Sequence, residues 1–376
     1  MEKIKIYFDG VLYSWINTGG VVRYFDELIK NFGTNIEATM LFHYPHLPVS
    51  LPKNINATNL LTTSPERVKL AYKAQRMAFK YVNRFLLERH FSKITEGVFH
   101  STYYTTYKRL HIPQVVTVHD MTYEKFPNFF NSAGARRFIR EKEKSIRAAD
   151  QIICISETTK EDVMKYYNLP AHNMHVVYHG VSTKFRVTPR SEKCTLDMDK
   201  PFILFVGKRD GYKNFSQLLT AFAGWQGNQS HTLVVAGDAW SQSEVEQIDA
   251  SGMTGKIKNV GYVSDTDLVS LYNNAEVFVY TSRYEGFGLP LLEAAACHTP
   301  VIAADIPVFK EIASEWATFF VLDDVDSLID ALDTFPRRDH QSIDFNFLKK
   351  YSWEQTAEQT ENVYREAVAN YKYPPL

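Results

Sequence analysis

The chain has 376 residues, 45% of them hydrophobic and 23% charged, a composition that is typical of globular proteins. A chain of this length is too long to fold around one ordinary hydrophobic core, which predicts two domains. The formal net charge of −1 gives no general support for a nucleic-acid partner. The three cysteines, Cys154, Cys194 and Cys297, form no CxxC pair, which argues against a zinc site or disulfide framework and favours the cytoplasm. We expect neither a signal peptide nor a membrane-spanning helix, since no long apolar run is present.

Short apolar runs alternate with longer amphipathic segments along the chain, the pattern typical of parallel α/β sheets. The first set of predicted strands covers residues 4–8, 36–42, 97–100, 115–119, 152–156 and 175–178. A second set covers residues 202–206, 232–236, 258–260, 277–281, 301–304 and 319–322. The sequence therefore predicts two doubly wound α/β domains at residues 1–181 and 201–351, joined by a polar linker at residues 182–200. Residues 353–371 predict one long amphipathic helix.

Residues 65–93 differ in charge from the rest of the chain. They carry eight Lys and Arg against two Glu, interleaved with apolar residues at helical spacing. One interpretation is a helix with a core stripe and a solvated basic face. The other is a surface that contacts anionic lipid or a phosphate-bearing acceptor, because basic amphipathic helices bind such surfaces.

A glycine-rich turn and a helix follow the predicted strand 277–281. Gly286 and Gly288 allow close approach of a ligand to the backbone, and Pro290 suits the first turn of the helix. We expect free N–H groups of Phe287, Gly288 and Leu289 to form an anion site suited to a diphosphate.

Two glutamates flank this turn. Glu285 stands at the mouth of the strand, where open α/β sheets bind ligands. Glu293 lies eight residues later in an apolar helix, where a carboxylate is costly unless its oxygens are used. A sugar diol would be a suitable partner for Glu293, and a structural helix cap is the alternative.

Three further loops carry candidate residues. Strand 202–206 ends in the basic loop Gly207-Lys208-Arg209-Asp210-Gly211-Tyr212-Lys213-Asn214, which would otherwise be an ordinary solvated loop. The turn Gly19-Gly20 follows the first strand, at a spacing that differs from a dinucleotide fingerprint. His119 and Asp120 end strand 115–119, a position that favours a site for His119, whereas Asp120 also suits a capping role.

Together these motifs resemble the retaining glycosyltransferases of family 4, which have the GT-B fold, over nearly the whole chain. Glu285 and Glu293 match the family's E-x7-E motif. The resemblance implies two Rossmann-like domains that face each other across a cleft, with residues 352–376 returning to the N-terminal domain. The donor would lie mainly on the C-terminal domain.

The resemblance also implies roles for the candidate residues. Glu285 would contact the donor sugar, Glu293 the nucleotide ribose, and His119 the sugar. Lys213 would neutralise the leaving diphosphate together with Lys208 or Arg209, two alternatives that the motif leaves open. Gly20 would approach the donor phosphate, and Tyr262 and Val263 would lie at the base pocket before the predicted helix 265–274.

The resemblance implies a metal-independent transfer of a hexose with retention, and no cofactor. The pairs of aspartates at residues 197–199 and 265–267 lie in the linker and at a helix N-cap, so neither predicts a metal site. The expected partners are a GDP- or UDP-linked donor, with GDP-mannose favoured, and a glycan or lipid-linked acceptor of surface-polysaccharide assembly. The expected location is cytoplasmic, with peripheral contact to an anionic membrane and no nucleic acid. The alternatives are a GT-B sugar-nucleotide epimerase or phosphorylase, or a non-catalytic nucleotide-sugar-binding protein.

Overall fold

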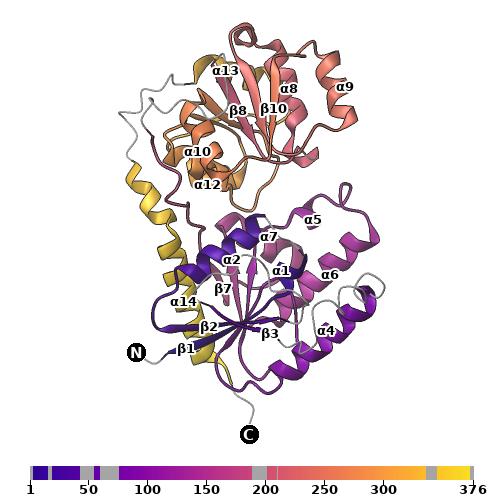
Figure 1. Ribbon diagram of the computed structural model, residues 1–376, viewed down its shortest axis with the longest axis vertical. Coiled ribbons are helices and arrows are strands. Elements are labelled where there is room, and N and C mark those ends of the chain that lie inside the picture. The colour runs from indigo at the N-terminus through magenta and orange to yellow at the C-terminus, as the bar shows by residue number, and fades with distance from the viewer. Residues whose placement is uncertain are drawn as a thin grey trace. The chain divides into compact units, whose positions relative to one another are not determined.

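The computed structural model describes residues 3–15, 19–42, 55–59, 76–188, 201–209, 211–335 and 345–372. The chain divides into two compact units. Unit 1 comprises Met1–Gly180 and Trp353–Leu376, and unit 2 comprises Val181–Ser352. Each unit contains one parallel sheet, most of whose consecutive strands are connected along the chain by helices (Figure 1). The predicted α/β class with two Rossmann-like sheets is confirmed.

The sheet of unit 1 has the strand order β3-β2-β1-β4-β5-β6-β7, and every neighbouring pair is parallel. Its strands are β1 Ile4–Asp9, β2 Ile36–Phe42, β3 Asn56–Asn59, β4 Val98–Ser101, β5 Gln114–Val118, β6 Gln151–Cys154 and β7 Met174–Val176. Strands β4, β5 and β6 are buried at every position, as expected of strands that helices cover on both faces. Its helices are α1 Val11–Trp15, α2 Gly20–Lys30, α4 Arg76–Phe91, α5 Thr122–Lys125, α6 Ala133–Ala148, α7 Glu157–Tyr167 and α14 Trp353–Asn370.

Strand β3 was not predicted from the sequence. Its residues read NATN, which are poor in β-branched and aromatic side chains, and Asn56, Ala57 and Thr58 are exposed. The strand lies at the edge of the sheet and pairs in parallel with β2. Backbone pairing with β2 defines this strand, so its side chains carry no core pattern that a sequence could reveal.

Helix α14 packs on unit 1, far in sequence from the rest of that unit (Figure 1). Trp353 and Tyr364 are buried in the core with β1 and α2 residues. The Tyr364 hydroxyl lies 2.7 Å from His100 Nδ1, and Thr356 Oγ1 donates to the carbonyl of Tyr178 at 2.7 Å. This long helix was predicted, and the resemblance correctly implied its return to the N-terminal unit.

The sheet of unit 2 has the order β10-β9-β8-β11-β12-β13 and is also parallel. Its strands are β8 Phe202–Val206, β9 Thr232–Ala236, β10 Ile257–Gly261, β11 Val277–Tyr280, β12 Val301–Ala304 and β13 Thr318–Phe320. Its helical segments are η1 Gly211–Lys213, α8 Phe215–Gly224, η2 Gln226–Gln229, α9 Gln242–Ala250, α10 Asp265–Asn274, α11 Leu289–Ala296, α12 Pro307–Ala313, α13 Val325–Thr334 and η4 Phe345–Tyr351. The strand order reverses direction between β8 and β11, which makes this pair the switch point of the sheet.

The predicted linker, residues 182–200, is described only as far as residue 188. That part packs on α10: Lys184 Nζ lies 2.7 Å from Asp265 Oδ2, and the N–H of Thr188 donates to Asn273 Oδ1 at 2.9 Å. Residues 189–200, including the first aspartate pair and Cys194, lie outside the described residues.

The basic segment 65–93 is described from Arg76 onward, and its side chains from Arg84 onward. Leu87 and Phe91 are buried, whereas Arg84, Phe85 and Arg89 are exposed on α4. The predicted core stripe is therefore confirmed in this part. In the described ranges, no helix combines the length and apolar character that crossing a membrane would need.

Candidate functional site

The loops that follow β8 and β11 lie side by side, because these two strands are neighbours at the switch point. The β8 loop carries Lys208 and Lys213, and the β11 loop carries Glu285. Ligands of open α/β sheets bind at this place, outside the carboxyl ends of the strands. The topology thus brings residues of two separate sequence motifs to one edge.

Lys213 and Glu285 form an ion pair at this edge. The Nζ atom of Lys213 donates to Oε1 of Glu285 at 2.5 Å, and both side chains are largely buried, with 17% and 14% exposed. The same oxygen also accepts hydrogen bonds from Ser282 Oγ at 2.6 Å and Tyr280 OH at 2.8 Å. Oε2 of Glu285 accepts no hydrogen bond from any residue in the described ranges. One carboxylate oxygen is therefore saturated and the other remains able to accept a donor.

Tyr280 and Ser282 were not identified from the sequence. Tyr280 is the last residue of β11, and burial together with the Glu285 carboxylate raises the pKa of its hydroxyl well above the ordinary value. Its hydroxyl therefore stays protonated and acts as a donor. Only their spacing of five and three residues before Glu285 could have indicated these donors.

Backbone contacts fix Lys213 against the β11 loop. The carbonyl of Lys213 accepts from Thr281 Oγ1 at 2.8 Å, and the carbonyl of Tyr212 accepts from the N–H of Arg283 at 2.8 Å. Asn214 adopts a left-handed conformation at φ 56° directly before α8. Asn and Gly tolerate this conformation best among the amino acids. These contacts place the Lys213 side chain reproducibly at the sheet edge.

The start of α11 supplies backbone donors. Gly288 precedes the helix at φ 111°, and a Cβ there would lie 3.1 Å from the Phe309 ring, so glycine is required. The N–H groups of Gly288 and Leu289 donate to no acceptor within the described part of the chain. Phe287 is buried, and its ring lies 6.1 Å from that of Tyr351. Two N–H groups at a helix start can bind an anion such as a phosphate.

Glu293 is buried inside α11, with 5% of its surface exposed. Its Oε2 atom accepts a hydrogen bond from the Tyr272 hydroxyl at 3.3 Å. Tyr272 lies on α10 and is itself fully buried. The carboxylate is thus oriented by a neighbouring helix.

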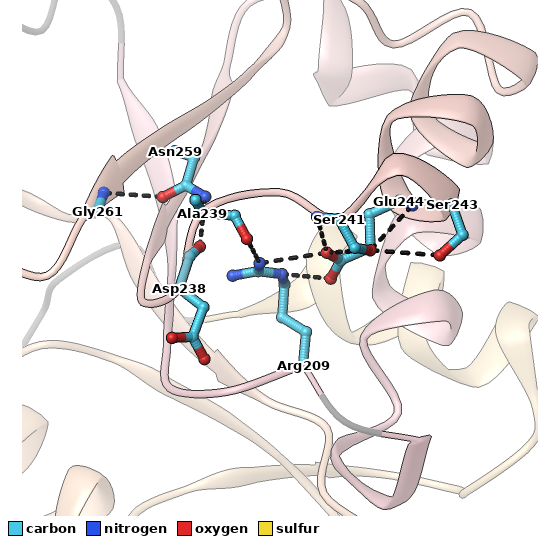
Figure 2. A network of polar contacts seen from close by, with 8 residues as sticks. All are labelled: Arg209, Asp238, Ala239, Ser241, Ser243, Glu244, Asn259 and Gly261. Carbon is cyan, nitrogen blue, oxygen red and sulfur yellow. Dashed lines mark hydrogen bonds and ion pairs between the residues drawn. The ribbon is translucent and has the colours of Figure 1, made fainter. Parts of the chain in front are cut away.

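Lys208 and Arg209, the two alternatives for the second cation, have different environments. Arg209 is only 3% exposed in its side chain and pairs with Glu244, with Nε 2.5 Å from Oε1 (Figure 2). Lys208 is exposed and makes no ion pair within the described ranges. The guanidinium of Arg209 is engaged within the protein, whereas the Lys208 ammonium is accessible.

Tyr262 and Val263 follow β10. Tyr262 is 76% exposed, and its hydroxyl donates to Asp238 Oδ1 at 2.5 Å. Val263 is half-buried. The exposed ring lies at the carboxyl end of its strand, the edge where parallel sheets bind ligands.

The aspartates at 265 and 267 lie in the first turn of α10. The N-cap is Ser264, whose Oγ accepts from the N–H of Asp267 at 3.2 Å and donates to its carboxylate. The expected capping chemistry is present, with Ser264 rather than an aspartate as the cap. Among the residues that the structure describes, no group of three or more His, Cys, Asp or Glu is arranged to hold a metal ion.

In unit 1, His119 directly follows β5. Its ring packs edge to face against that of Tyr24, with the ring centroids 5.0 Å apart. The backbone N–H of His119 donates to the Tyr104 hydroxyl at 3.3 Å. Nε2 of His119 is buried and has no hydrogen-bond partner in the described part of the chain. The pKa of His119 is lowered to about 4, mainly by desolvation and to a smaller extent by Lys142, while the Asp120 carboxylate opposes the shift. The imidazole is therefore neutral at neutral pH.

The loop after His119 is held by residues that the sequence did not single out. Lys142 is buried and donates to the carbonyl of Asp120 at 2.6 Å and to Glu124 Oε2 at 3.0 Å. The Asp120 side chain accepts from the N–H of Thr122 at 2.9 Å, so it supports the first residue of α5, although the N-cap of that helix is Met121. These contacts orient the end of β5.

Gly20 is exposed at the first position of α2, and a Cβ there would contact nothing within 4 Å. The preceding Gly19 lies at φ 142°, in the region that favours glycine. Asn17 and Thr18 of the same motif lie outside the described residues.

Two family models match consecutive parts of the chain. Residues 18–185 match the model described as Glycosyltransferase Family 4, and residues 188–342 match that described as Glycosyl transferases group 1. The chain belongs to these glycosyltransferases. The boundary between the two matches lies at residues 186–187, within the segment between the two sheets.

Curated relatives and solved structures agree with this family. The glycosyltransferase is 26% identical to O-antigen chain mannosyltransferase B of Escherichia coli over 92% of this chain and 96% of the relative. It is 29% identical to O-antigen chain mannosyltransferase RfbU of Salmonella typhimurium over 56% of this chain and 57% of the relative. The structure of WaaG, a glycosyltransferase involved in lipopolysaccharide biosynthesis, matches with a TM-score of 0.64 and 14% identity, over 98% of this chain and 100% of WaaG. The glycosyltransferase therefore has the GT-B fold.

Proposed function

We propose that this glycosyltransferase is a retaining, metal-independent mannosyltransferase that uses GDP-mannose, with UDP-hexoses as the next candidates. Its acceptor is a glycan or a lipid-linked saccharide in surface-polysaccharide assembly. The observation that carries the proposal is the contact of Lys213 with Glu285 at the switch point of unit 2, the place where open α/β sheets bind their ligands.

The leaving diphosphate would be stabilised by the protein's own positive charges and dipoles. Lys213, Lys208 and the N–H groups of Gly288 and Leu289 are the groups that support this role. Donors that are fixed where negative charge develops lower the barrier most effectively, because they need no reorganisation during the reaction. In this scheme the bond between the anomeric carbon and the diphosphate oxygen breaks while the acceptor oxygen bonds to that carbon. The acceptor proton leaves with the diphosphate.

The remaining candidates would orient the donor. In this proposal Glu285 contacts the sugar through Oε2, and Glu293 accepts from the ribose hydroxyls. Tyr262 and Val263 lie on the side of the base. In unit 1, His119 contacts the sugar as a neutral imidazole, and Gly20 approaches the donor phosphate.

The choice of mannose rests on the relatives. The O-antigen mannosyltransferase of Escherichia coli aligns with nearly the whole chain. Anabaena Alr3699/HepE, a structural neighbour at 16% identity and a TM-score of 0.62, was solved with UDP, which keeps the uridine donors as the alternative.

A thermal-shift screen with GDP, UDP, GDP-mannose and UDP-glucose tests the donor. A ligand that binds the folded state raises the unfolding temperature by mass action, so only the matching base and diphosphate should stabilise the protein. We expect GDP and GDP-mannose to do so. Stabilisation by UDP and UDP-glucose alone would replace mannose by a uridine-linked hexose, and a protein that responds to none of the four would contradict the proposal.

We also propose that the acceptor is lipid-linked and that α4 contacts an anionic membrane. The exposed Arg84, Phe85 and Arg89 on the basic segment 65–93 support this contact. Each basic residue near an anionic surface contributes about 1 kcal/mol, so binding should be reversible and weakened by salt. The protein should co-sediment with anionic vesicles at low salt and ignore neutral ones, and Arg84→Gln with Arg89→Gln should weaken this binding. If the wild-type protein does not bind anionic vesicles at low salt, the basic face of α4 is only a solvated surface.

A further inference from the structure

The β8 loop that carries Lys208 and Lys213 is fastened to the neighbouring β9 loop by Arg209. Nε of Arg209 donates to Glu244 Oε1 at 2.5 Å, and Nη2 donates to Oε2 at 3.3 Å (Figure 2). Nη2 also donates to the carbonyl of Ala239 at 2.9 Å, and the guanidinium lies over the Trp240 ring at 4.4 Å. We call Arg209, Ala239, Trp240 and Glu244 the Arg209 clamp.

Glu244 connects the clamp to the start of α9. Its Oε2 atom accepts from the N–H of Ser241 at 2.7 Å, and its own N–H donates to Ser241 Oγ at 3.3 Å, which together form a capping box; Ser241 Oγ also donates to Oε2 at 2.8 Å. Partial burial raises the pKa of Glu244, but the hydrogen bonds from Arg209 and Ser241 outweigh it and hold this pKa below its ordinary value. The carboxylate is thus a charged partner for Arg209 at neutral pH.

The two loops also touch backbone to backbone. A Cβ on Gly237 would lie 2.3 Å from the carbonyl oxygen of Gly207, so only glycine fits there. The N–H of Gly207 donates to the carbonyl of Ala236 at 2.9 Å. The β8 loop therefore leaves the sheet in a path that the β9 loop determines, immediately before Lys208.

The clamp does not have the features of a pair that serves stability alone. The Arg209 side chain is 3% exposed, and its buried Nη1 has no hydrogen-bond partner within the described ranges. Buried ion pairs are often no more stabilising than apolar residues of the same size, and an unsatisfied nitrogen adds a cost. What a guanidinium with two bonds to one carboxylate does supply is a fixed geometry.

We propose that Arg209 is a positioning residue for the diphosphate site. It holds the β8 loop against α9 so that Lys208 and Lys213 keep their places. The inference rests on the proposed function, and it assigns Arg209 a role different from the direct diphosphate contact that was one of its alternatives. Lys208, adjacent and exposed, is then the second cation.

Calorimetric titrations of GDP, UDP, guanosine and uridine into matched variants test the clamp. Arg209→Met and Glu244→Gln should each weaken binding of the preferred diphosphate about tenfold, since each frees the loop, and should change nucleoside binding less than twofold. The double variant should resemble either single variant, because both changes remove one interaction. Arg209→Lys, which keeps the charge without the fork, should not restore affinity.

Ser241→Ala is the matched control, because it removes part of the capping box and leaves the Arg209–Glu244 contact in place. It should lower the unfolding temperature while diphosphate affinity stays within twofold of the wild type. The inference is overturned if folded Arg209→Met binds the diphosphate as the wild type does. It is also overturned if the losses of diphosphate affinity in Arg209→Met and Glu244→Gln add up in the double variant, because additive losses would indicate that Arg209 contacts the diphosphate directly. A wild type that binds neither diphosphate would overturn the proposed function and the inference with it.

Discussion

Lys213 and Glu285 stand 72 residues apart in the chain, and their charged atoms meet at 2.5 Å on neighbouring strand ends. The pair joins the two motifs that carry the proposed chemistry. A diphosphate bound beside α11 would compete with Glu285 for the Lys213 ammonium. In the proposed function, donor binding and the orientation of Glu285 would therefore be coupled through one lysine.

Lys213→Ala tests whether the Lys213 ammonium stabilises the negative charge of the leaving diphosphate. Replacing this loop residue should leave the protein folded and lower kcat/KM by about 10²–10³, the usual effect of removing one preorganised charge partner. Steady-state transfer kinetics measure the change. Lys256→Ala is the control, because Lys256 precedes β10 at the opposite end of the strands and pairs with Asn228. Activity of Lys213→Ala within threefold of the wild type would place the diphosphate elsewhere.

The two glutamates should separate in kinetics and in binding. Glu285→Gln should mainly lower kcat, because its proposed partner is the reacting sugar. Glu293→Gln should mainly weaken binding of the free nucleoside diphosphate, because its proposed partner is the ribose. Titrating the diphosphate into both variants checks this assignment, which fails if Glu285→Gln loses more nucleotide affinity than Glu293→Gln.

Tyr280→Phe removes one donor to Glu285 without changing the ring. We expect kcat to fall about tenfold while the dissociation constant of the nucleoside diphosphate stays within twofold, because only the orientation of Glu285 changes. The unfolding temperature of the variant serves as the control for the fold. Unchanged kcat would show that Lys213 and Ser282 suffice to orient the carboxylate.

Stability should fall in acid because of buried histidines. Desolvation lowers the pKa of His100 from 6.5 to about 3. Between these values the unfolded chain binds a proton that the folded chain does not, so stability is full above the unfolded pKa and falls as the pH decreases. At about pH 5, His100 alone should cost about 2 kcal/mol relative to about pH 8.

Urea unfolding of the wild type and of His100→Gln at both pH values measures how much His100 contributes to the loss of stability in acid. The variant should be less stable at about pH 8, because it loses the bonds to Tyr364 and Thr117. Its dependence on pH should be weaker than that of the wild type by the His100 contribution. Equal pH dependence in the two proteins would assign the acid sensitivity to other groups.

Much of the fold could be predicted from the sequence, because parallel strands buried on both faces read as continuous apolar runs. Strands β8, β9 and β12 match their predicted bounds, and helix α10 does so as well. The polar edge strand β3 has no such run and was missed. The candidate motifs stood out in the sequence because glycines, carboxylates and lysines cluster in short loops after strands.

The contacts between loops could not be predicted in the same way. Lys208 and Arg209 are adjacent, and only the paths of the β8 and β9 loops determine that Arg209 reaches Glu244 while Lys208 stays exposed. Lys142 lies 22 residues from Asp120, and nothing in its helical sequence marks it as a partner of that loop. Such pairings depend on which side chains the folded sheet brings together.

Turnover in excess EDTA tests the central claim, that the protein's own groups carry the charge of the leaving diphosphate. Because Lys213, Lys208 and the start of α11 supply positive charge and N–H donors, the account predicts that the rate of sugar transfer stays within about twofold of its value without EDTA. A complete loss of transfer in EDTA that Mg²⁺ restores would contradict the account.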